Sequence, residues 1–449
     1  MDDGAYVVVN GECPTCALVR PLLGSLPVVV VDEDTESGLE TSFGWGVDTV
    51  PTLVRIAGGV EVERHVGWLR EEWRAFFGDP GLGAELPEYR PGCGARAVEP
   101  LVEARLRGRT LRSRRVELAS EEDEIEAMFD RGWSDGLPVV PPTPERVARM
   151  LSGTVRSPDE VVAVVPPDLV ECTVEKVAVN AVLAGCKPEY LPVVLACVEA
   201  ACTAEFNAHG LLATTYFSSP VVVVNGPVAR RIGMNWGLNA LGQGNRANAT
   251  IGRALQLVIR NVGGGRPGEV DRATLGNPGK YTFCFAEDEE GSPWEPLAGG
   301  GASAVTLFAG DGVRGVVDQL SREPESLARS LALALLAVAH PKLVVAFDAM
   351  LVVSPEHARV FRDAGWSKDR LRSELLALTT RPGSELVQGA GGIAEGLPAG
   401  FEGAQLPKFR EDGLLIVHAG GGAGMFSAVI GGWVNGETGS MPVTREVGG

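Results

Sequence analysis

Hydrophobic positions in the first 80 residues alternate between short apolar runs and a helical period. The runs are rich in valine and are bounded by glycine, proline and acidic residues, which is typical of strands. A Gly-Gly pair between two of them indicates a hairpin. The pattern predicts strands at residues 5–10, 27–31, 52–57 and 60–65, with helices at 14–24 and 69–77.

The alternation continues on a larger scale beyond residue 116. Apolar runs at 220–224 and 343–353 predict buried strands, and periodic stretches such as 247–262 predict the helices between them. Such alternation is typical of an α/β domain with a mostly buried sheet. The stretch 83–115 lacks periodicity, with glycine and proline at its start and arginine at its end. We therefore expect an α/β protein with domains at 1–82 and 116–449 joined by a linker at 83–115.

Charge and composition narrow the range of partners. The chain has 449 residues, 45% of them hydrophobic, and a net charge of −18. This charge argues against nucleic acid or an anionic membrane as a partner. The acidic start does not resemble a signal peptide, and no apolar stretch reaches the ~18 residues of a membrane helix. We expect a cytoplasmic protein, alone or as an oligomer, whose eight cysteines are catalytic or buried rather than structural disulfides.

The sequence Cys-Pro-Thr-Cys at 13–16 directly follows the first predicted strand. Proline suits the first turn of a helix, so Cys13 is expected at a helix N-terminus, where free amides stabilise a thiolate. The thiolate is the species that attacks a disulfide. A zinc site is the alternative, but it needs four ligands and only His65 and Cys93 lie nearby in sequence. Cys13 and Cys16 are therefore interpreted as a redox-active disulfide pair.

Together with Thr-Val-Pro-Thr at 49–52, these features resemble the thioredoxin superfamily in its small, glutaredoxin-sized form. The resemblance covers about residues 1–80 and implies a thioredoxin-like domain. It also implies a cis Val50-Pro51 peptide beside the dithiol, with Pro51 helping to present a backbone edge to a partner's disulfide. In this scheme Cys13 attacks and Cys16 resolves, and an external thiol or a thioredoxin-type reductant supplies electrons.

Two further cysteines stand out beside the dithiol. Cys186 lies in a Gly-Cys-Lys-Pro turn between two predicted helices. Lys187 would lower its pKa and the negative end of the preceding helix would raise it. An inert buried cysteine is the common alternative. Because the chain carries its own dithiol, we interpret Cys186 as the acceptor. Cys93 is either a mobile linker thiol that reaches either domain or a passive residue.

Polar residues in the large domain indicate an anionic small-molecule substrate. His209 lies in a loop and is the natural proton shuttle near neutral pH. Asp135 lies in a proline-rich segment and is a candidate acid, base or ligand. The other candidates line a helix start or a glycine loop, both of which suit anions. They are Asn245, Arg246, Asn248, His418, Gly420, Gly421, Gly422, Gly424 and Ser427.

The large domain also resembles a bacterial family without an assigned activity, through its W-x-D-G-L-P-V-V-P-P-T, A-G-C-K-P-E-Y and G-G-G-A-G-x-F-S segments; this resemblance implies no function. The sequence predicts a thiol-dependent oxidoreductase whose dithiol recycles a cysteine or substrate in the large domain. One alternative is a sulfur-transfer or carbon–sulfur (carbon–heteroatom) lyase. The other is a disulfide-repair or partner-binding protein without its own substrate. No cofactor is required, and a metal among Asp135, His209 and His418 is not indicated.

Overall fold

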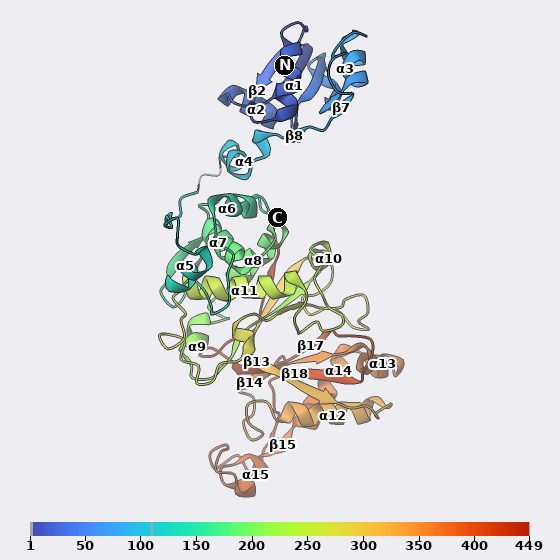
Figure 1. The fold of residues 1–449 in the computed structure, drawn as a ribbon. Helices are drawn as coiled ribbons and strands as arrows, with labels where there is room; N and C mark the ends of the chain where they lie inside the picture. The colour runs from blue at the N-terminus through green and yellow to red at the C-terminus, as the bar shows by residue number, and fades with distance from the viewer. Residues whose placement is uncertain (1–2, 109–110, 449) are drawn as a thin grey trace. The chain divides into compact units, whose positions relative to one another are not determined.

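The computed structural model describes residues 3–108 and 111–448, which fall into two compact units. The N-terminal unit takes in the described residues up to Leu111 together with residues 144–149. The large unit takes in residues 112–143 and those from Met150 onward. Each unit combines helices with β-sheet, so the predicted α/β class is confirmed (Figure 1).

The N-terminal unit is built on a four-stranded sheet in the order β2–β1–β4–β5. β1 and β2 are parallel, as expected for strands joined by a helix, and β4 pairs antiparallel with both β1 and β5. Trp68 and Trp73 are fully buried in its core. The elements are β1 (Gly4–Val9), α1 (Pro14–Leu23), β2 (Val29–Asp32), α2 (Glu36–Gly44), β3 (Thr49–Val50), β4 (Thr52–Ala57), β5 (Val60–Val66), β6 (Trp68–Leu69) and α3 (Arg70–Phe77).

Residues 83–108, expected to be linker, instead fold as part of this unit. The fully buried carboxylate of Glu33 accepts the backbone amides of Arg96 at 2.7 Å and Ala97 at 3.2 Å, which fixes the segment to the core. Two-residue strands are too short to show a period, so the sequence pattern missed them. The elements are β7 (Tyr89–Arg90), which pairs with β6, β8 (Cys93–Gly94), which pairs with β3, the 3-10 helix η1 (Arg96–Val98) and α4 (Pro100–Leu106).

A seven-stranded mixed sheet forms the centre of the large unit. Its order is β12–β11–β13–β18–β14–β17, with β19 paired to β13. β11 with β12 and β14 with β17 are parallel, and the other pairs are antiparallel. The predicted apolar strands are present and largely buried. The strands are β11 (Ser219–Asn225), β12 (Cys284–Ala286), β13 (Ala304–Val317), β14 (Phe347–Val353), β17 (Leu414–His418), β18 (Phe426–Val434) and β19 (Val443–Glu446).

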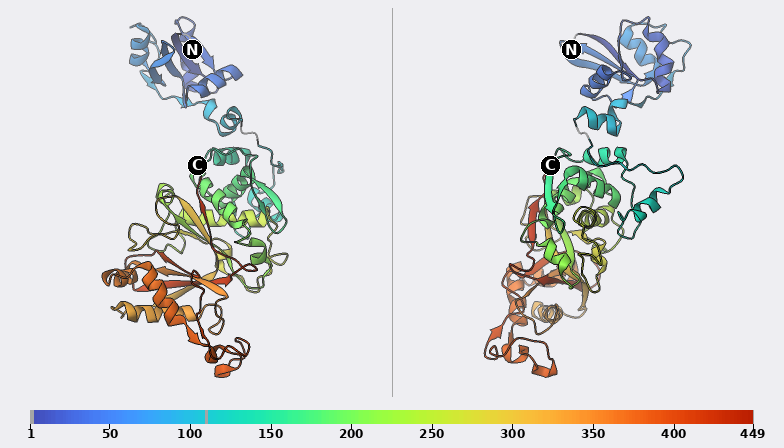
Figure 2. Two further views of the ribbon diagram at one scale, coloured as in Figure 1. Left: turned by 180° about the vertical axis from the view of Figure 1, so that it is seen from behind. Right: turned by 90° about the vertical axis from the view of Figure 1, so that its left-hand side faces the viewer.

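The main helices of the large unit form two groups at opposite ends of it (Figure 2). The first group, α7, α8 and α11, contacts β12, β13 and β19; the second, α12, α13 and α14, contacts β13, β17 and β18. The first group is α7 (Val174–Ala184), α8 (Leu191–Ala201) and α11 (Arg246–Asn261), and the second is α12 (Pro324–Leu336), α13 (Pro355–Asp363) and α14 (Lys368–Thr379).

Shorter elements complete the described chain. They are α5 (Glu124–Asp130), α6 (Pro144–Leu151), the hairpin of β9 (Val161–Val165) and β10 (Val170–Thr173), η2 (Pro188–Tyr190), α9 (Ala208–Ala213), α10 (Pro227–Arg231), η3 (Pro278–Lys280), β15 (Arg381–Pro382), α15 (Gly383–Leu386), η4 (Ala390–Gly392) and β16 (Gln405–Leu406).

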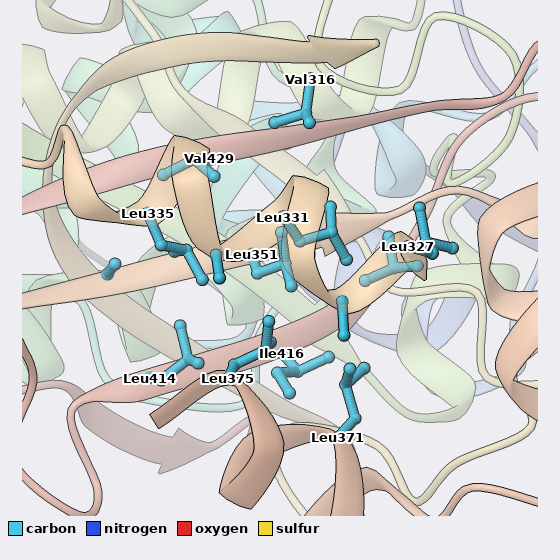
Figure 3. Close-up of a cluster of buried hydrophobic side chains, with 14 of the residues drawn as sticks. Val316, Leu327, Leu331, Leu335, Leu351, Leu371, Leu375, Leu414, Ile416 and Val429 are labelled. Carbon is cyan, nitrogen blue, oxygen red and sulfur yellow. The ribbon is translucent and has the colours of Figure 1, made fainter. Parts of the chain in front are cut away.

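Both faces of the central sheet are apolar. Leu351 of β14 points into a cluster with Leu331 of α12 and Leu375 of α14 (Figure 3). The next residue on either side points to the other face, where Met350 packs in a cluster with Phe308. Burial on both faces explains the continuous apolar runs of the sequence. Of the helices in the described ranges, none has the length and apolar character needed to cross a membrane.

Candidate functional site

The two cysteines of the Cys-Pro-Thr-Cys motif lie at the first turn of α1. Cys13 is the N-cap, and its Sγ accepts the backbone amide of Cys16 at 3.1 Å. Pro14 occupies the first helical position, where no amide hydrogen is needed. As a neutral thiol, Cys13 donates to the carbonyl of Val50 at 3.4 Å. Both thiols are buried, with 2% of Cys13 and none of Cys16 exposed.

The surroundings shift the pKa values of the two thiols in opposite directions. Burial raises the pKa of Cys13, but hydrogen bonds from the Cys93 and Cys16 thiols and from the Cys16 and Thr15 amides outweigh it, so that the net pKa is lowered. Burial raises the pKa of Cys16 strongly, and its hydrogen bond to Cys13 raises it further. Of the two thiols, Cys13 is therefore the one that ionises at the lower pH.

The Val50-Pro51 peptide is cis, as expected from the sequence. Its neighbour β3 pairs antiparallel with β8, with Val50 opposite Cys93. A side chain on Gly92 would meet the Thr49 methyl at 2.3 Å, so this close approach requires glycine. Cys93 packs against the buried cluster that contains Cys13, and hydrogen bonding with Cys13, followed by burial, raises the pKa of Cys93. A third thiol thus lies at the dithiol.

Cys186 lies in a different environment from the one its turn motif suggested. Gly185 is left-handed and ends α7, and the backbone amide of Cys186 bonds back to Ala181 at 2.9 Å. The side chain is only 7% exposed, and its Sγ donates to the carbonyl of Thr250 at 3.3 Å. Burial raises the pKa of Cys186 to about 12. A thiol protonated at neutral pH is a poor nucleophile, so the structure disfavours Cys186 as the electron acceptor.

The remaining cysteines of the large unit are similar. Burial raises the pKa of Cys172 and of Cys202 to about 12, and it also raises those of Cys197 and Cys284. Among the residues that the structure describes, none of these thiols has the amide donors that surround Cys13. His209, the predicted proton shuttle, is exposed on the first turn of α9.

Asp135 is tied into an ion pair. Arg253 of α11 donates from Nε and Nη2 to the two carboxylate oxygens of Asp135, both at 2.8 Å. The same guanidinium bonds the carbonyls of Leu137 and Pro138 at 3.1 Å. The pair is largely buried and anchors the proline-rich segment to α11. Asp135 is therefore a positioned carboxylate.

The three candidates at the start of α11 make internal contacts. Asn245 caps the helix by accepting the Asn248 amide at 3.0 Å. The Asn248 side chain bonds both the amide and the carbonyl of Asn235, at 3.0 and 2.8 Å. Arg246 donates to the carbonyl of Gly185 at 2.9 Å. These contacts give the three residues structural roles at the start of α11, and their predicted role in anion binding stays a prediction.

The glycine loop after β17 also contacts protein. The amide of Gly420 donates to the Trp236 carbonyl at 2.8 Å, and a side chain on Gly421 would meet Leu238 at 2.4 Å. The structure thus brings this loop and Asn248 to the same segment, residues 235–238. Gly424 has a positive φ of 99°, and a side chain on Gly422 would meet open space.

The polar residues on either side of this loop are buried. Nδ1 of His418 lies 3.1 Å from the Asp288 carbonyl oxygen, while its buried Nε2 has no hydrogen-bond partner among the residues described. Ser427 shares a 2.7 Å hydrogen bond with Nδ1 of His357, a residue that the sequence did not single out as functional. Within residues 3–108 and 111–448, no group of three or more His, Cys, Asp and Glu side chains is placed to hold a metal.

The large unit contains a cavity of about 520 Å³, within the usual range for small-molecule sites. Lys280 lines it and donates to Asp271 at 2.8 Å. Three other lining residues, Arg260, Ser218 and Ser219, have a buried Nε or hydroxyl without a partner in the part of the chain that the structure describes. Asp135 also lines it. Sequence reasoning missed the others because they come from distant segments without a common motif.

No protein-family model, curated protein or solved structure matches this chain in the comparisons made.

Proposed function

We propose that the N-terminal unit is a thioredoxin-like domain that catalyses thiol–disulfide exchange. The observation that carries the proposal is the opposite shift of two neighbouring thiols: the pKa of Cys13 is lowered and that of Cys16 is raised. An attacking group must be a thiolate, and a resolving group is best kept protonated until it is needed. The sheet order β2–β1–β4–β5, with the dithiol at the start of α1, is in keeping with such a domain.

The exchange proceeds in two steps. The Cys13 thiolate attacks one sulfur of a disulfide RS–SR, which forms a mixed disulfide and releases RS⁻. Cys16 then loses its proton and attacks Sγ of Cys13, which forms the Cys13–Cys16 disulfide and releases the second thiolate. The substrate gains the two electrons that the dithiol loses. An external thiol or a thioredoxin-type reductant restores the dithiol by the reverse exchange.

Steady-state reduction of hydroxyethyl disulfide by glutathione tests this function with the full-length chain. We expect the wild-type protein to accelerate the reaction and Cys13→Ser to remove the acceleration, because serine is not a thiolate nucleophile. Cys202 is a partly buried cysteine of the large unit, so Cys202→Ser is the matched control. This variant should retain the acceleration. A wild-type rate equal to the uncatalysed rate would show that the proposal is wrong.

A second candidate function for the large unit is binding of an anionic small molecule in the cavity. The unpartnered Nε of Arg260 and hydroxyls of Ser218 and Ser219 favour it, since buried polar groups without partners are costly unless a ligand or water satisfies them. A planar guanidinium suits carboxylate or phosphate. This anion site lies at the last turn of α11, whereas the sequence predicted one at the start of the same helix. Binding of an anionic substrate here is compatible with both the oxidoreductase and the lyase alternatives.

Calorimetry with succinate and with inorganic phosphate as probes tests this second function. Arg260→Met should weaken binding of the better probe at least about tenfold, the size expected for one lost charged hydrogen bond. Arg230→Met, an exposed arginine outside the cavity lining, is the control. Equal affinity in the two variants, or no binding of either probe to the wild type, would exclude an anion site of this kind.

A further inference from the structure

The segment at residues 89–94, which we call the β7–β8 segment, lies against the dithiol and carries its own thiol. We propose that Cys93 is a third reactive cysteine of the N-terminal unit, which attacks a mixed disulfide on Cys13 in competition with Cys16. This inference rests on the proposed exchange activity and adds to it a second internal disulfide, Cys13–Cys93.

Contacts on both sides hold Cys93 in place. β8 pairs with β3, so that Cys93 lies opposite Val50, whose carbonyl accepts the Cys13 thiol at 3.4 Å. On one side of Cys93, Thr15 donates to the carbonyl of Pro91 at 2.7 Å. On the other, the amide of Ala95 bonds the Asp48 carbonyl at 3.0 Å. Cys93 thus packs against the cluster that contains Cys13, from which the ~2 Å bond of a disulfide forms by a local adjustment.

The chemistry of the mixed disulfide favours Cys93 over Cys16. The largest cause that raises the pKa of Cys93 is its hydrogen bond to Cys13, and burial comes second. Once Cys13 is bonded to a substrate sulfur, it no longer carries a negative charge, and its effect of raising the pKa of Cys93 disappears. The contacts with Thr15, which lower the pKa of Cys93, remain. Burial is the largest cause of the raised pKa of Cys16, and Cys16 stays buried in the mixed disulfide. Cys93 is also only half-buried, whereas Cys16 is fully buried.

The proposed step balances with a small disulfide as oxidant. Cys93 loses its proton to solvent, its thiolate attacks Sγ of Cys13, and the thiolate RS⁻ leaves as the Cys13–Cys93 bond forms. Cys16 attack on Cys13 would then give the Cys13–Cys16 disulfide and return Cys93 as a thiol. The β7–β8 segment also occupies the backbone edge of β3, so a polypeptide substrate pairing there would have to displace it.

Stoichiometric oxidation of full-length variants by glutathione disulfide tests the inference. In Cys16→Ser we expect two glutathione molecules released per chain, and peptide mapping without reduction should find Cys13 bonded to Cys93. In Cys16→Ser/Cys93→Ser we expect one released glutathione and a stable mixed disulfide at Cys13. If Cys16→Ser stops at the mixed disulfide with one glutathione released, the inference about Cys93 is overturned while the exchange function stands.

Failure of the exchange function itself has a different signature. In that case the double variant would form no mixed disulfide at Cys13. If Cys16→Ser does not fold, acid-quenched time points of the wild-type chain carry the same information. There we expect Cys13–Cys93 to form before Cys13–Cys16, and absence of the Cys13–Cys93 peptide at every time point would overturn the inference.

Discussion

Cys13 in the N-terminal unit and Cys186 in the large unit are alike in burial and opposite in electrostatics. Each is less than one-tenth exposed, and each thiol donates to one backbone carbonyl, that of Val50 at 3.4 Å or that of Thr250 at 3.3 Å. The pKa of Cys13 is nevertheless lowered, while burial raises that of Cys186 to about 12. Neither burial nor a carbonyl partner therefore decides in which direction the pKa of a thiol shifts.

The difference lies in the donors that face the sulfur. Cys13 begins α1, so the amides of Thr15 and Cys16 point at it, and two further thiols donate to it. Cys186 follows the end of α7, where carbonyls rather than amides are free. The contact with Thr250 and the charge of Arg246 lower its pKa, but they do not offset burial. Position at the start or the end of a helix thus goes with a lowered pKa for Cys13 and a raised pKa for Cys186.

Two aspartates of the large unit repeat this contrast. Burial raises the pKa of Asp311, and the charge of Arg314, the Tyr216 hydroxyl and the Gly431 amide do not offset it. For Asp318, burial also acts upward, but hydrogen bonds from the hydroxyl of Ser330 and from the hydroxyl and amide of Ser321 lower the pKa to about 2. The balance between desolvation and donors therefore holds for carboxylates as it does for thiols.

Alkylation of the native protein is the strongest test of the cysteine comparison. At pH 7 a thiol with a pKa near ~8.5 is a few per cent thiolate, whereas one with a pKa of about 12 is ionised in about one molecule in 10⁵. We expect iodoacetamide to modify Cys13 at least about a thousandfold faster than Cys186. Mass spectrometry of digests over time measures both rates, and similar rates at the two sites would refute the comparison.

Serine substitutions of the same two cysteines should affect the turnover of disulfide exchange differently, by a factor smaller than the difference in alkylation rates. Cys13→Ser should lower the glutathione-dependent reduction of hydroxyethyl disulfide at least about a hundredfold. Cys186→Ser should leave it within about twofold, contrary to the role that the sequence assigned to Cys186. Circular dichroism of both variants controls for folding. Loss of turnover in a folded Cys186→Ser protein would restore Cys186 as the electron acceptor.

Removing a hydrogen-bond donor from Cys13 should raise its pKa toward that of Cys186. Cys93→Ala takes away a hydrogen bond that lowers the pKa of Cys13, so that this pKa should rise. Cys93→Ser keeps a hydroxyl donor and is the matched control, with a smaller rise expected. The pH dependence of Cys13 alkylation measures both variants. An unchanged profile in Cys93→Ala would show that the Cys16 thiol and the helix amides set this pKa without Cys93.

The smallest effect is expected at Asp318. Because its folded-state pKa of about 2 lies below the ordinary value of 3.8, the carboxylate stabilises the fold above about pH 4, and this contribution is lost as pH falls toward 2. Ser330→Ala removes one donor, so that the folded-state pKa of Asp318 should rise, its contribution to stability should shrink, and acid unfolding should occur at a higher pH. Acid unfolding followed by circular dichroism measures the shift, with the exposed Ser373→Ala as control. Coincident acid transitions in the two variants would contradict this assignment.

Local patterns in the sequence were enough to predict the helix that the dithiol begins and the strands around it. Proline after Cys13 and the short valine-rich runs gave α1, β1 and the β4–β5 hairpin nearly residue by residue, because these features depend on neighbours in sequence. The sequence singled out the Cys93 thiol but not its fixed place beside the dithiol, because its strand partner Val50 is distant in sequence and β8 has only two residues. The glycine and proline on either side of Cys186 indicated a turn, but they did not indicate the direction in which the Cys186 side chain points.

The same limit applies to the large unit. Apolar runs identified β11, β14 and β17, but β18 contains small residues such as Gly431 and Gly432 and was not recognised as a strand. Gly432 is needed there because a side chain would meet the Asp348 carbonyl oxygen at 2.7 Å. The cavity escaped prediction because its lining combines segments from residue 135 to residue 281. Tertiary packing, rather than local preference, brings these groups together.

The position of β18 in the central sheet has a consequence for how the chain is made. Translation delivers β13 and β14 well before β18, yet β18 lies between them and pairs with both. Until Val434 has left the ribosome, two long apolar strands therefore have unpaired edges, which are templates for pairing with other nascent chains. We expect the large unit to complete its folding late in synthesis, so that a stall before Phe426 would yield aggregates rather than a partly active protein.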